Sequence, residues 1–291
     1  MKKILVSACL FLLGAAGLYS QMDALNPNTP TPMEEIRPLN PGDAVVELKT
    51  TLGDIYVDLY NDTPLHRANF LKLVGEGFYD GVLFHRVIDN FMVQTGDPKS
   101  KAASAGQQLG EGDPGYTIEA EIEYPRHYHK YGALAAARTG DAVNPEKRSS
   151  GSQFYIVTGK KHSERQMEAM EEKQINQQMQ SYFQNLAMQY RDSIQSMQKA
   201  GDQEGLEALR QKLIKETEEN VKPSRLPENI KSDYATIGGT PHLDGGYTVF
   251  GEVLKGMDVV EKIQKAETDS SDRPTEDIRI ISAKVINAGE K

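Results

Sequence analysis

The chain has 291 residues, of which 38% are hydrophobic, and a formal net charge of −9 at pH 7. This length allows one or two packed cores. The acidic balance argues against a nucleic-acid surface, because phosphate binding usually requires a basic face.

The first twenty residues have the layout of a secretory signal peptide. Lys2 and Lys3 precede a mostly apolar run over residues 4–18, which is shorter than the ~20 residues of a membrane-spanning helix. We therefore expect export to the periplasm or cell envelope without a stable membrane span. The only cysteine, Cys9, lies inside this run, so the exported chain would hold no thiol. Lipidation of Cys9 is the less favoured alternative, because the apolar run continues past it.

Residues 21–42 contain five prolines and little apolar surface, which predicts an extended linker. Alternating runs from Ala44 onward then predict a hairpin, and residues 64–76 have helical spacing. We expect one domain over residues 43–291, interrupted by a helical insertion at about 163–232. Its further short strands are expected at 81–87, 91–96, 116–122, 132–138, 152–158, 247–253 and 279–287. Many short strands with few helices indicate a closed antiparallel barrel or a sandwich.

The expected insertion shows no strand pattern between Ser163 and Lys222. Ser163 and Gln166 fit a capping box at its start, and Gly201 with Asp202 predicts the end of one helix and the start of another. These signals indicate a helical hairpin. Apolar residues recur every three or four positions, which places them on one face: Ile175, Met179, Tyr182, Phe183, Leu186, Tyr190, Ile194 and Met197.

Two apparent motifs are set aside because of their context. The GxGxxG match at residues 110–115 contains Pro114 and precedes an expected strand, whereas a dinucleotide loop opens a helix. The sequence His-Tyr-His at 127–129 has no third ligand at a recognisable spacing, so we interpret it as a surface loop. The signatures HExxH, GxSxG and the P-loop are absent from the sequence. We therefore expect neither a metal nor a cofactor.

The stretch FHRVIDNFMVQTGD, residues 84–97, places polar groups among aromatic and thioether side chains. If the neighbouring strands lie side by side, their apolar residues would form a shallow patch with Arg86, Gln94 and Gln153 at its edge. Single residues of this kind are more often ordinary core and edge positions. The other members of the patch would be Phe84, Phe91, Met92, Ala137, Phe154, Tyr155, Leu243 and Tyr247.

Four segments in order resemble the cyclophilin-type peptidyl-prolyl cis-trans isomerases: FHRVIDNFMVQTGD, GALAAAR, SGSQFYIV and HLDGGYTVFGEV. The resemblance covers about residues 44–160 and 234–288. It implies a mainly β fold, a closed eight-stranded antiparallel barrel capped by two helices, here Pro64 to Glu76 and Met257 to Ala266. It also implies isomerase activity on proline-containing polypeptides, and for an exported protein assistance to the folding of unfolded exported proteins.

The same resemblance implies the roles of individual residues. Arg86 would be catalytic and Gln94 would orient it. Gln153, with the backbone near Ala137 and Arg138, would hold the substrate chain, while His85 would be structural. The proline ring would lie among Phe91, Met92, Tyr155 and Leu243, beside His242 and Tyr247.

The sequence departs from the family at several of these positions. Many relatives have tryptophan in place of His242, histidine in place of Tyr247 and asparagine in place of Arg138. The last change could alter the preference for the residue before proline. A non-catalytic module that holds proline peptides is the alternative function. The insertion either packs only on itself or binds clients or a partner, since five of the ten methionines fall within it.

Overall fold

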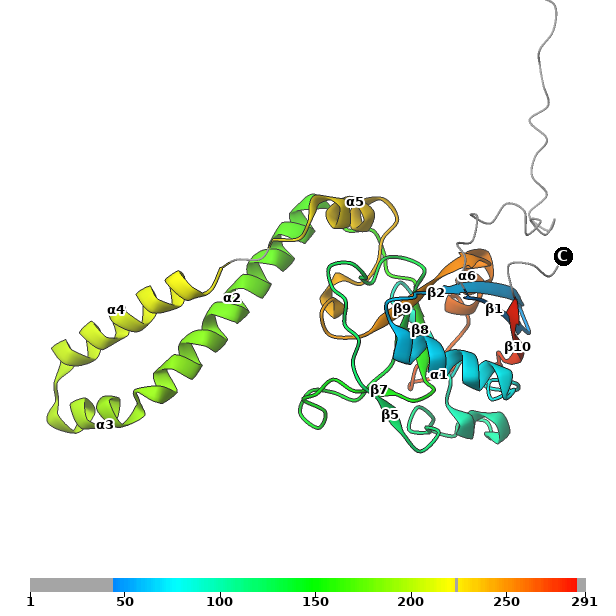
Figure 1. The fold of residues 1–291 in the computed structure, drawn as a ribbon, viewed down its shortest axis with the longest axis horizontal. Coiled ribbons are helices and arrows are strands. Elements are labelled where there is room, and N and C mark those ends of the chain that lie inside the picture. Colours follow the sequence, from blue (N-terminus) through cyan, green and yellow to red (C-terminus); the bar gives the residue numbers. More distant parts are fainter. Residues whose placement is uncertain (1–43, 223–224, 287–291) are drawn as a thin grey trace, which may run out of the picture. The chain divides into compact units, whose positions relative to one another are not determined.

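The computed structural model describes residues 44–222 and 225–286, so the expected signal peptide and linker lie outside the described residues. A β unit and a set of inserted helices make up this part of the chain (Figure 1). Within those two ranges, no helix is long and apolar enough to cross a membrane.

Eight antiparallel strands form the main sheet, in the spatial order β10-β1-β2-β9-β6-β8-β4-β3. The expected eight-stranded antiparallel sheet is thereby confirmed. Two further strands, β5 (Thr117–Ile118) and β7 (Ser149–Ser150), pair with each other in a small separate sheet. The strands of the main sheet are β1 (Ala44–Thr50), β2 (Gly53–Leu59), β3 (Arg86–Ile88), β4 (Met92–Thr95), β6 (Ala133–Ala136), β8 (Phe154–Val157), β9 (Val249–Lys255) and β10 (Ile280–Ile286).

The main sheet curls into a half-barrel, so the expectation of a closed barrel is wrong. Between its edge strands, β3 and β10, the structure has an isolated bridge from Leu83 to Arg279 in place of a continuous ladder. The free edge of β3 instead meets a turn, where the Val87 N–H donates to the Asp272 carbonyl at 2.7 Å. This turn occupies backbone groups that barrel closure would use.

Two helices pack on the main core, α1 (Pro64–Gly75) and α6 (Met257–Gln264). Pro64 begins α1 at a position where its missing N–H costs nothing. The Glu121 carboxylate accepts the Leu65 and His66 N–H groups of this first turn, both at 2.9 Å. That role explains why the expected strand at 116–122 shrinks to Thr117–Ile118, since its end turns toward the orphan donors of α1.

Alternation along the strands divides apolar side chains between the two faces of the sheet. One face joins the main core with α1 and α6, and includes Val87, Val93, Phe154 and Ile156. The other face carries a second apolar cluster, which includes Met92, Ala135, Tyr155 and Val157. In the described part of the chain, this second cluster contains no residue of an α-helix, which leaves its face available for a site.

Four helices between β8 and β9 form the helical insertion: α2 (Glu164–Gln189), α3 (Arg191–Ala200), α4 (Gln203–Asn220) and α5 (Glu228–Thr236). In Figure 1, α4 runs back beside α2, and the two helices are in contact. The capping box of Ser163 and Gln166 is confirmed. The boundary at Gly201 and Asp202 is also confirmed, with Gly201 in the left-handed region and the Asp202 side chain capping α4.

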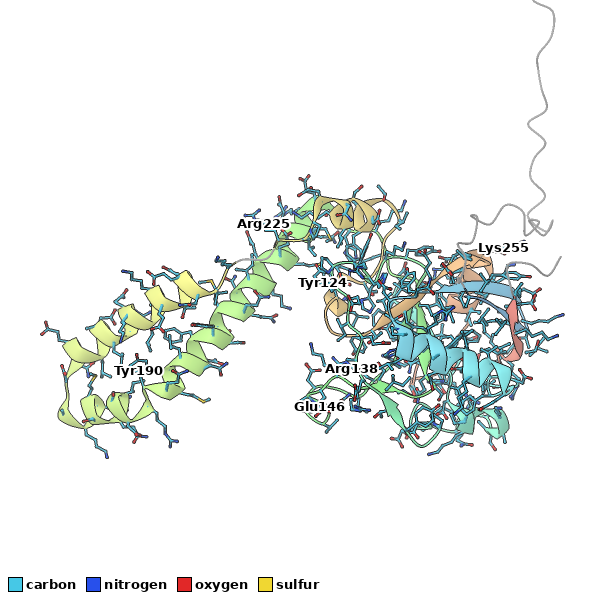
Figure 2. All side chains as sticks on the ribbon, viewed as in Figure 1. Tyr124, Arg138, Glu146, Tyr190, Arg225 and Lys255 are labelled. Atoms are coloured by element: carbon cyan, nitrogen blue, oxygen red, sulfur yellow. The ribbon has the colours of Figure 1, made fainter. Side chains whose placement is uncertain are left out.

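The insertion differs from the expected two-helix hairpin at two places. The first long helix breaks at Tyr190, a residue that Figure 2 labels, where the Lys212 Nζ of α4 donates to the Tyr190 hydroxyl at 3.1 Å. The helix α5 was not anticipated, and it buries Ile230 and Tyr234. With helices holding more residues than strands, the described chain is mixed α/β rather than mainly β. Two short 3₁₀ helices, Pro98–Ala102 and Pro241–Leu243, complete it.

His85 is buried in the β unit, with 4% of its surface exposed. Burial is the largest cause that lowers its pKa from 6.5 to about 4. In the unfolded chain this side chain takes up a proton near pH 6.5, whereas in the folded protein it does so only near pH 4. The free energy of unfolding should therefore fall as the pH drops from about 6.5 to about 4.

We expect His85→Phe to remove this part of the acid sensitivity while keeping the ring volume. At ~1.36 kcal/mol per pKa unit, the wild type should lose about 3 kcal/mol more unfolding free energy than the variant between neutral pH and pH 4. Urea unfolding across this pH range measures the difference. Parallel pH profiles for the two proteins would contradict the assignment.

Candidate active site

A row of cross-strand neighbours runs over the second apolar face of the sheet. Arg86 on β3 pairs with Gln94 on β4, Gln94 pairs with Tyr155 on β8, and Tyr155 pairs with Ala135 on β6. Directly opposed residues on antiparallel strands point to the same face. The register therefore gathers a cation, an amide and an aromatic ring opposite the main core.

A pocket of about 420 Å³ opens beside this row. It brings together eight of the eleven expected site residues. The residues of this group are Arg86, Phe91, Gln94, Ala137, Arg138, Tyr155, Leu243 and Tyr247.

The other three expected residues lie next to the pocket. Met92 is 2% exposed and packs within the second apolar cluster. Gln153 is also buried, and its amide donates to the carbonyls of Gly110 and Gly112 at 2.9 and 2.7 Å. The His242 ring stacks on Phe91 with 5.5 Å between centroids. Partial burial is the main cause that lowers the pKa of His242.

The Arg86 side chain stands at the rim of the pocket, 44% exposed. Its Nε lies 3.6 Å from the Asp272 carboxylate, which approaches from the turn that bonds β3. The Gln94 amide donates to Gln153 Oε1 at 3.1 Å, so the contact that holds it runs toward Gln153. A direct orienting contact from Gln94 to Arg86 stays a prediction.

The Arg138 side chain is packed against the protein, with 5% of it exposed. Its guanidinium carbon lies 4.4 Å from the centroid of the Tyr247 ring. Its Nε donates to the Gly246 carbonyl at 2.7 Å, and its Nη1 pairs with Asp141 at 2.7 Å. Arg138 thus fixes Tyr247 and the neighbouring turn as one wall of the pocket.

A second wall, residues 106–111, was missed from the sequence. The fully buried Asp97 carboxylate accepts the N–H groups of Gly110 and Gly112 at 2.6 and 3.2 Å. A Cβ on Gly112 would lie 1.9 Å from Asp97 Oδ1, so a glycine is required there. Gly112 thus serves a close backbone approach to Asp97.

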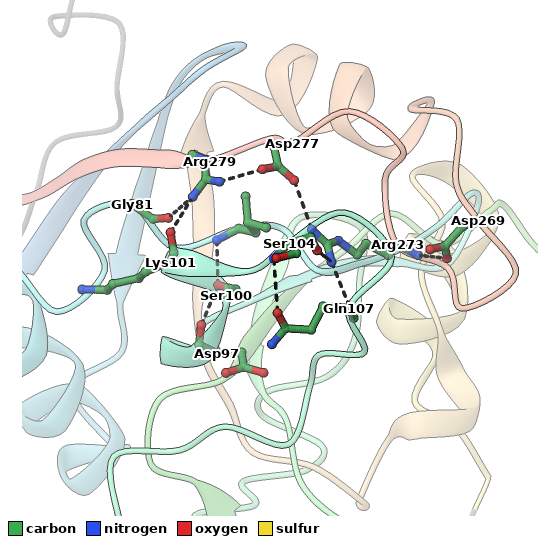
Figure 3. Close-up of polar contacts among 11 residues, drawn as sticks. Gly81, Asp97, Ser100, Lys101, Ser104, Gln107, Asp269, Arg273, Asp277 and Arg279 are labelled. Atoms are coloured by element: carbon green, nitrogen blue, oxygen red, sulfur yellow. Dashed lines mark hydrogen bonds and ion pairs between the residues drawn. The ribbon is translucent and has the colours of Figure 1, made fainter.

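The third wall, residues 269–273, was also missed. Arg273 is 5% exposed and donates through Nη1 to the carbonyls of Ser104 and Gln107, at 2.9 and 2.8 Å (Figure 3). The Asp269 carboxylate accepts the Arg273 N–H at 3.1 Å and tightens the turn. Arg273 therefore joins the two missed walls across more than 160 residues of sequence, a link without a local sequence signal.

The surface-loop interpretation of residues 127–129 is wrong for His129. That residue is 1% exposed, and its ring lies between Asp244 and Tyr155, each 2.9 Å away. His127 pairs instead with Asp62 at 2.7 Å. The two rings of the His-Tyr-His sequence therefore serve different contacts.

The pocket suits a ligand that combines an apolar ring with a neighbouring amide. Phe91, Tyr155 and Leu243 line it with apolar surface, and Arg86 supplies a permanent cation at the rim. His85 also lines the pocket, but with a pKa of about 4 it stays neutral at neutral pH. Burial raises the pKa of the Tyr155 hydroxyl, which keeps it protonated.

Comparison with known proteins gives consistent matches. The family described as "Cyclophilin type peptidyl-prolyl cis-trans isomerase/CLD" matches residues 45–216 and 228–285. A Staphylococcus saprophyticus protein described as a peptidyl-prolyl cis-trans isomerase is 30% identical over 250 residues, which are 85% of this chain and 94% of that protein.

Two further matches are partial or distant. A Streptococcus pyogenes protein described as a bifunctional phosphatase/peptidyl-prolyl cis-trans isomerase is 29% identical over 245 residues, 83% of this chain but 38% of its own length. A crystal structure of a Cryptosporidium parvum cyclophilin-type isomerase aligns with 84% of this chain and 98% of its own, at a TM-score of 0.49 and 19% identity.

The family match covers more than half of the chain, and it includes every residue of the pocket described above. The chain therefore belongs to the cyclophilin-type peptidyl-prolyl cis-trans isomerases.

Proposed function

We propose that this isomerase uses Arg86 as its catalytic group, supported by Gln94, and that it acts on exported proteins in the cell envelope. The observation that carries the first part is the row from Arg86 to Tyr155, which sets a cation beside an apolar floor. Phe91, Tyr155 and Leu243 are proposed to hold the proline ring.

Rotation about an X-Pro bond is slow because the amide nitrogen shares its lone pair with the carbonyl, which gives a barrier of about 18–20 kcal/mol. The cis form lies only about 0.5–1 kcal/mol above trans. A catalyst must therefore stabilise the twisted bond between the two planar forms, and no bond needs to break.

In the twisted state the nitrogen regains its lone pair and becomes a better hydrogen-bond acceptor. A donor fixed near that nitrogen stabilises the twisted state more than either planar state. Arginine suits this task because it stays protonated and presents a rigid planar set of donors. The partial exposure of Arg86 leaves its guanidinium accessible to a substrate amide.

We expect Arg86→Ala to lower kcat by about 10²–10³-fold, the usual cost of losing one transition-state donor. Exchange NMR on an Ala-Pro peptide measures the turnover, and circular dichroism checks the fold. Arg165→Ala is the matched control, because Arg165 is exposed on the first turn of α2. Turnover that is unchanged in Arg86→Ala would reject the assignment.

The envelope location rests on the signal-like first twenty residues. We expect the full chain to appear in the envelope fraction of expressing bacteria, with a mature N-terminus downstream of the apolar run. A chain lacking residues 1–20 should stay in the cytoplasm. Export of that shortened chain would contradict the signal.

We also propose that the helical insertion binds unfolded client chains. An apolar groove of about 380 Å³ lies among α2, α3 and α4, lined in part by Phe183, Ile194 and Leu206. Met188 is 66% exposed, as an adaptable contact requires. Met167, by contrast, is 1% exposed and packs at the root of the insertion, so it is not available to clients.

A deletion of residues 176–219, closed by a short Gly-Ser linker, separates client binding from turnover. It keeps Met167, Glu171 and α5, which pack or bond together at the root. We expect unchanged peptide turnover and weaker suppression of aggregation of an unfolding protein, measured by light scattering. Full-length Arg86→Ala is the control and should suppress aggregation like the wild type. Equal suppression by the truncated chain would reject client binding.

A further inference from the structure

A continuous chain of buried polar contacts leads from the pocket floor to the last helix of the insertion. The Tyr155 hydroxyl lies 2.9 Å from His129 Nε2, and His129 Nδ1 lies 2.9 Å from Asp244 Oδ1. The Tyr234 hydroxyl, on α5, donates to Asp244 Oδ2 at 2.6 Å. We call these four residues the tyrosine-to-tyrosine chain.

All four residues of the tyrosine-to-tyrosine chain are buried. His129 is 1% exposed, Tyr155 is 4% exposed, Tyr234 is fully buried and the Asp244 side chain is 5% exposed. Buried polar groups lose their hydrogen bonds to water and need partners in the protein. A series of buried groups that are all hydrogen-bonded is therefore rigid, and the loss of one of its hydrogen bonds is costly.

The contacts determine which atoms donate. The Asp244 carboxylate is an acceptor and already takes the Tyr234 O–H and the His129 backbone N–H, the latter at 2.9 Å. Its third contact requires a proton on His129 Nδ1. In the neutral imidazole, Nε2 then accepts the Tyr155 O–H. The orientation of the Tyr155 ring is thus set by groups outside the pocket.

Asp244 also follows Leu243 directly, and Leu243 lines the pocket. The turn that carries both is closed by backbone hydrogen bonds from Leu243 to Thr240 and from Gly246 to Leu243, both at 3.0 Å. A displacement of Asp244 would therefore move the Leu243 wall as well as the Tyr155 floor.

At its Tyr234 end, the tyrosine-to-tyrosine chain lies in the root of the insertion, where α5 and the first turn of α2 pack against the β unit. Tyr234 packs with Ile230 of α5 and Met167 of α2, against Tyr124 and Tyr128 of the β unit. The His162 N–H, just before α2, donates to the Tyr234 carbonyl at 2.9 Å. Contacts from α5 itself and from the start of α2 thus hold Tyr234 in place.

We propose that Tyr234, Asp244 and His129 are positioning residues for the proline pocket, through which the root of the insertion sets the affinity for proline peptides. The proposal rests on the proposed function of Tyr155 and Leu243 as the proline pocket. Its physical basis is that a buried carboxylate oxygen left without its donor must move or gain water, which shifts both walls that Asp244 supports.

The test compares two tyrosine hydroxyls of the same cluster. Tyr234→Phe removes the donor to Asp244 and keeps the ring. Tyr128→Phe removes a hydroxyl that donates to Asp233, a residue that does not belong to the tyrosine-to-tyrosine chain. Titration with an Ala-Pro peptide gives the affinity, and exchange NMR at saturation gives the interconversion rate of the bound peptide. The ¹⁵N resonances of the His129 ring, recorded without peptide, report directly on its hydrogen bonds to Asp244 and Tyr155.

For Tyr234→Phe we expect a loss of about tenfold in peptide affinity, which corresponds to about 1.4 kcal/mol, with a nearly unchanged interconversion rate. We also expect displaced His129 ring resonances. Tyr128→Phe should match the wild type in all three measurements. Unchanged affinity in Tyr234→Phe, or an equal loss in Tyr128→Phe, would overturn the proposal.

Asp244→Asn repeats the test if Tyr234→Phe does not fold, because the amide keeps the volume and loses the charge. A failure of the proposed function has a different signature. In that case Arg86→Ala would retain its turnover, or the wild type would not bind the peptide, whereas the His129 resonances of Tyr234→Phe would still be displaced.

Discussion

The antiparallel register across β3, β4 and β8 is the constraint on which the site depends. It opposes Gln94 to Arg86 on one side and to Tyr155 on the other. If one of these strands slipped by one residue, its side chain in this row would be replaced by a neighbour from the core face and would itself turn toward the main core. The apolar residues of the core face, among them Val87, Val93 and Phe154, make such a slip costly and so protect the site.

Buried polar contacts then fix the walls around that row. Asp97 holds the glycines of residues 110–112, Arg273 joins residues 104–107 to the turn at 269–273, and His129 with Asp244 supports Tyr155. The reaction needs no proton transfer, so the protein can use these groups to hold geometry. A structural role for these groups agrees with the low pKa of His85, which leaves a neutral ring beside the cation Arg86.

The parts that the sequence predicted well have local signals. The strands around Arg86 and Tyr155 follow from alternation and from motifs typical of the family. The ends of α2, α3 and α4 near Ser163, Gly201 and Asp202 follow from capping residues. The eight residues that meet in the pocket were found because the family resemblance named them, and their individual roles stay predictions.

The parts that were missed depend on partners far away in the sequence. His129 is buried because Asp244 lies 115 residues later and accepts from it twice. The half-barrel stays open because the turn at Asp272 takes the edge of β3. Similarly, α5 forms where Ile230 and Tyr234 meet Met167, and the break at Tyr190 lies where Lys212 of another helix contacts it.

The most direct measurement of the proposed mechanism is exchange NMR on a saturating proline peptide with Arg86→Gln. This variant keeps a planar amide donor and removes the fixed charge. We expect interconversion of the bound peptide to slow by about 10²-fold or more, while the dissociation constant stays close to that of the wild type. An unchanged interconversion rate, with the loss confined to affinity, would contradict stabilisation of the twisted bond by Arg86.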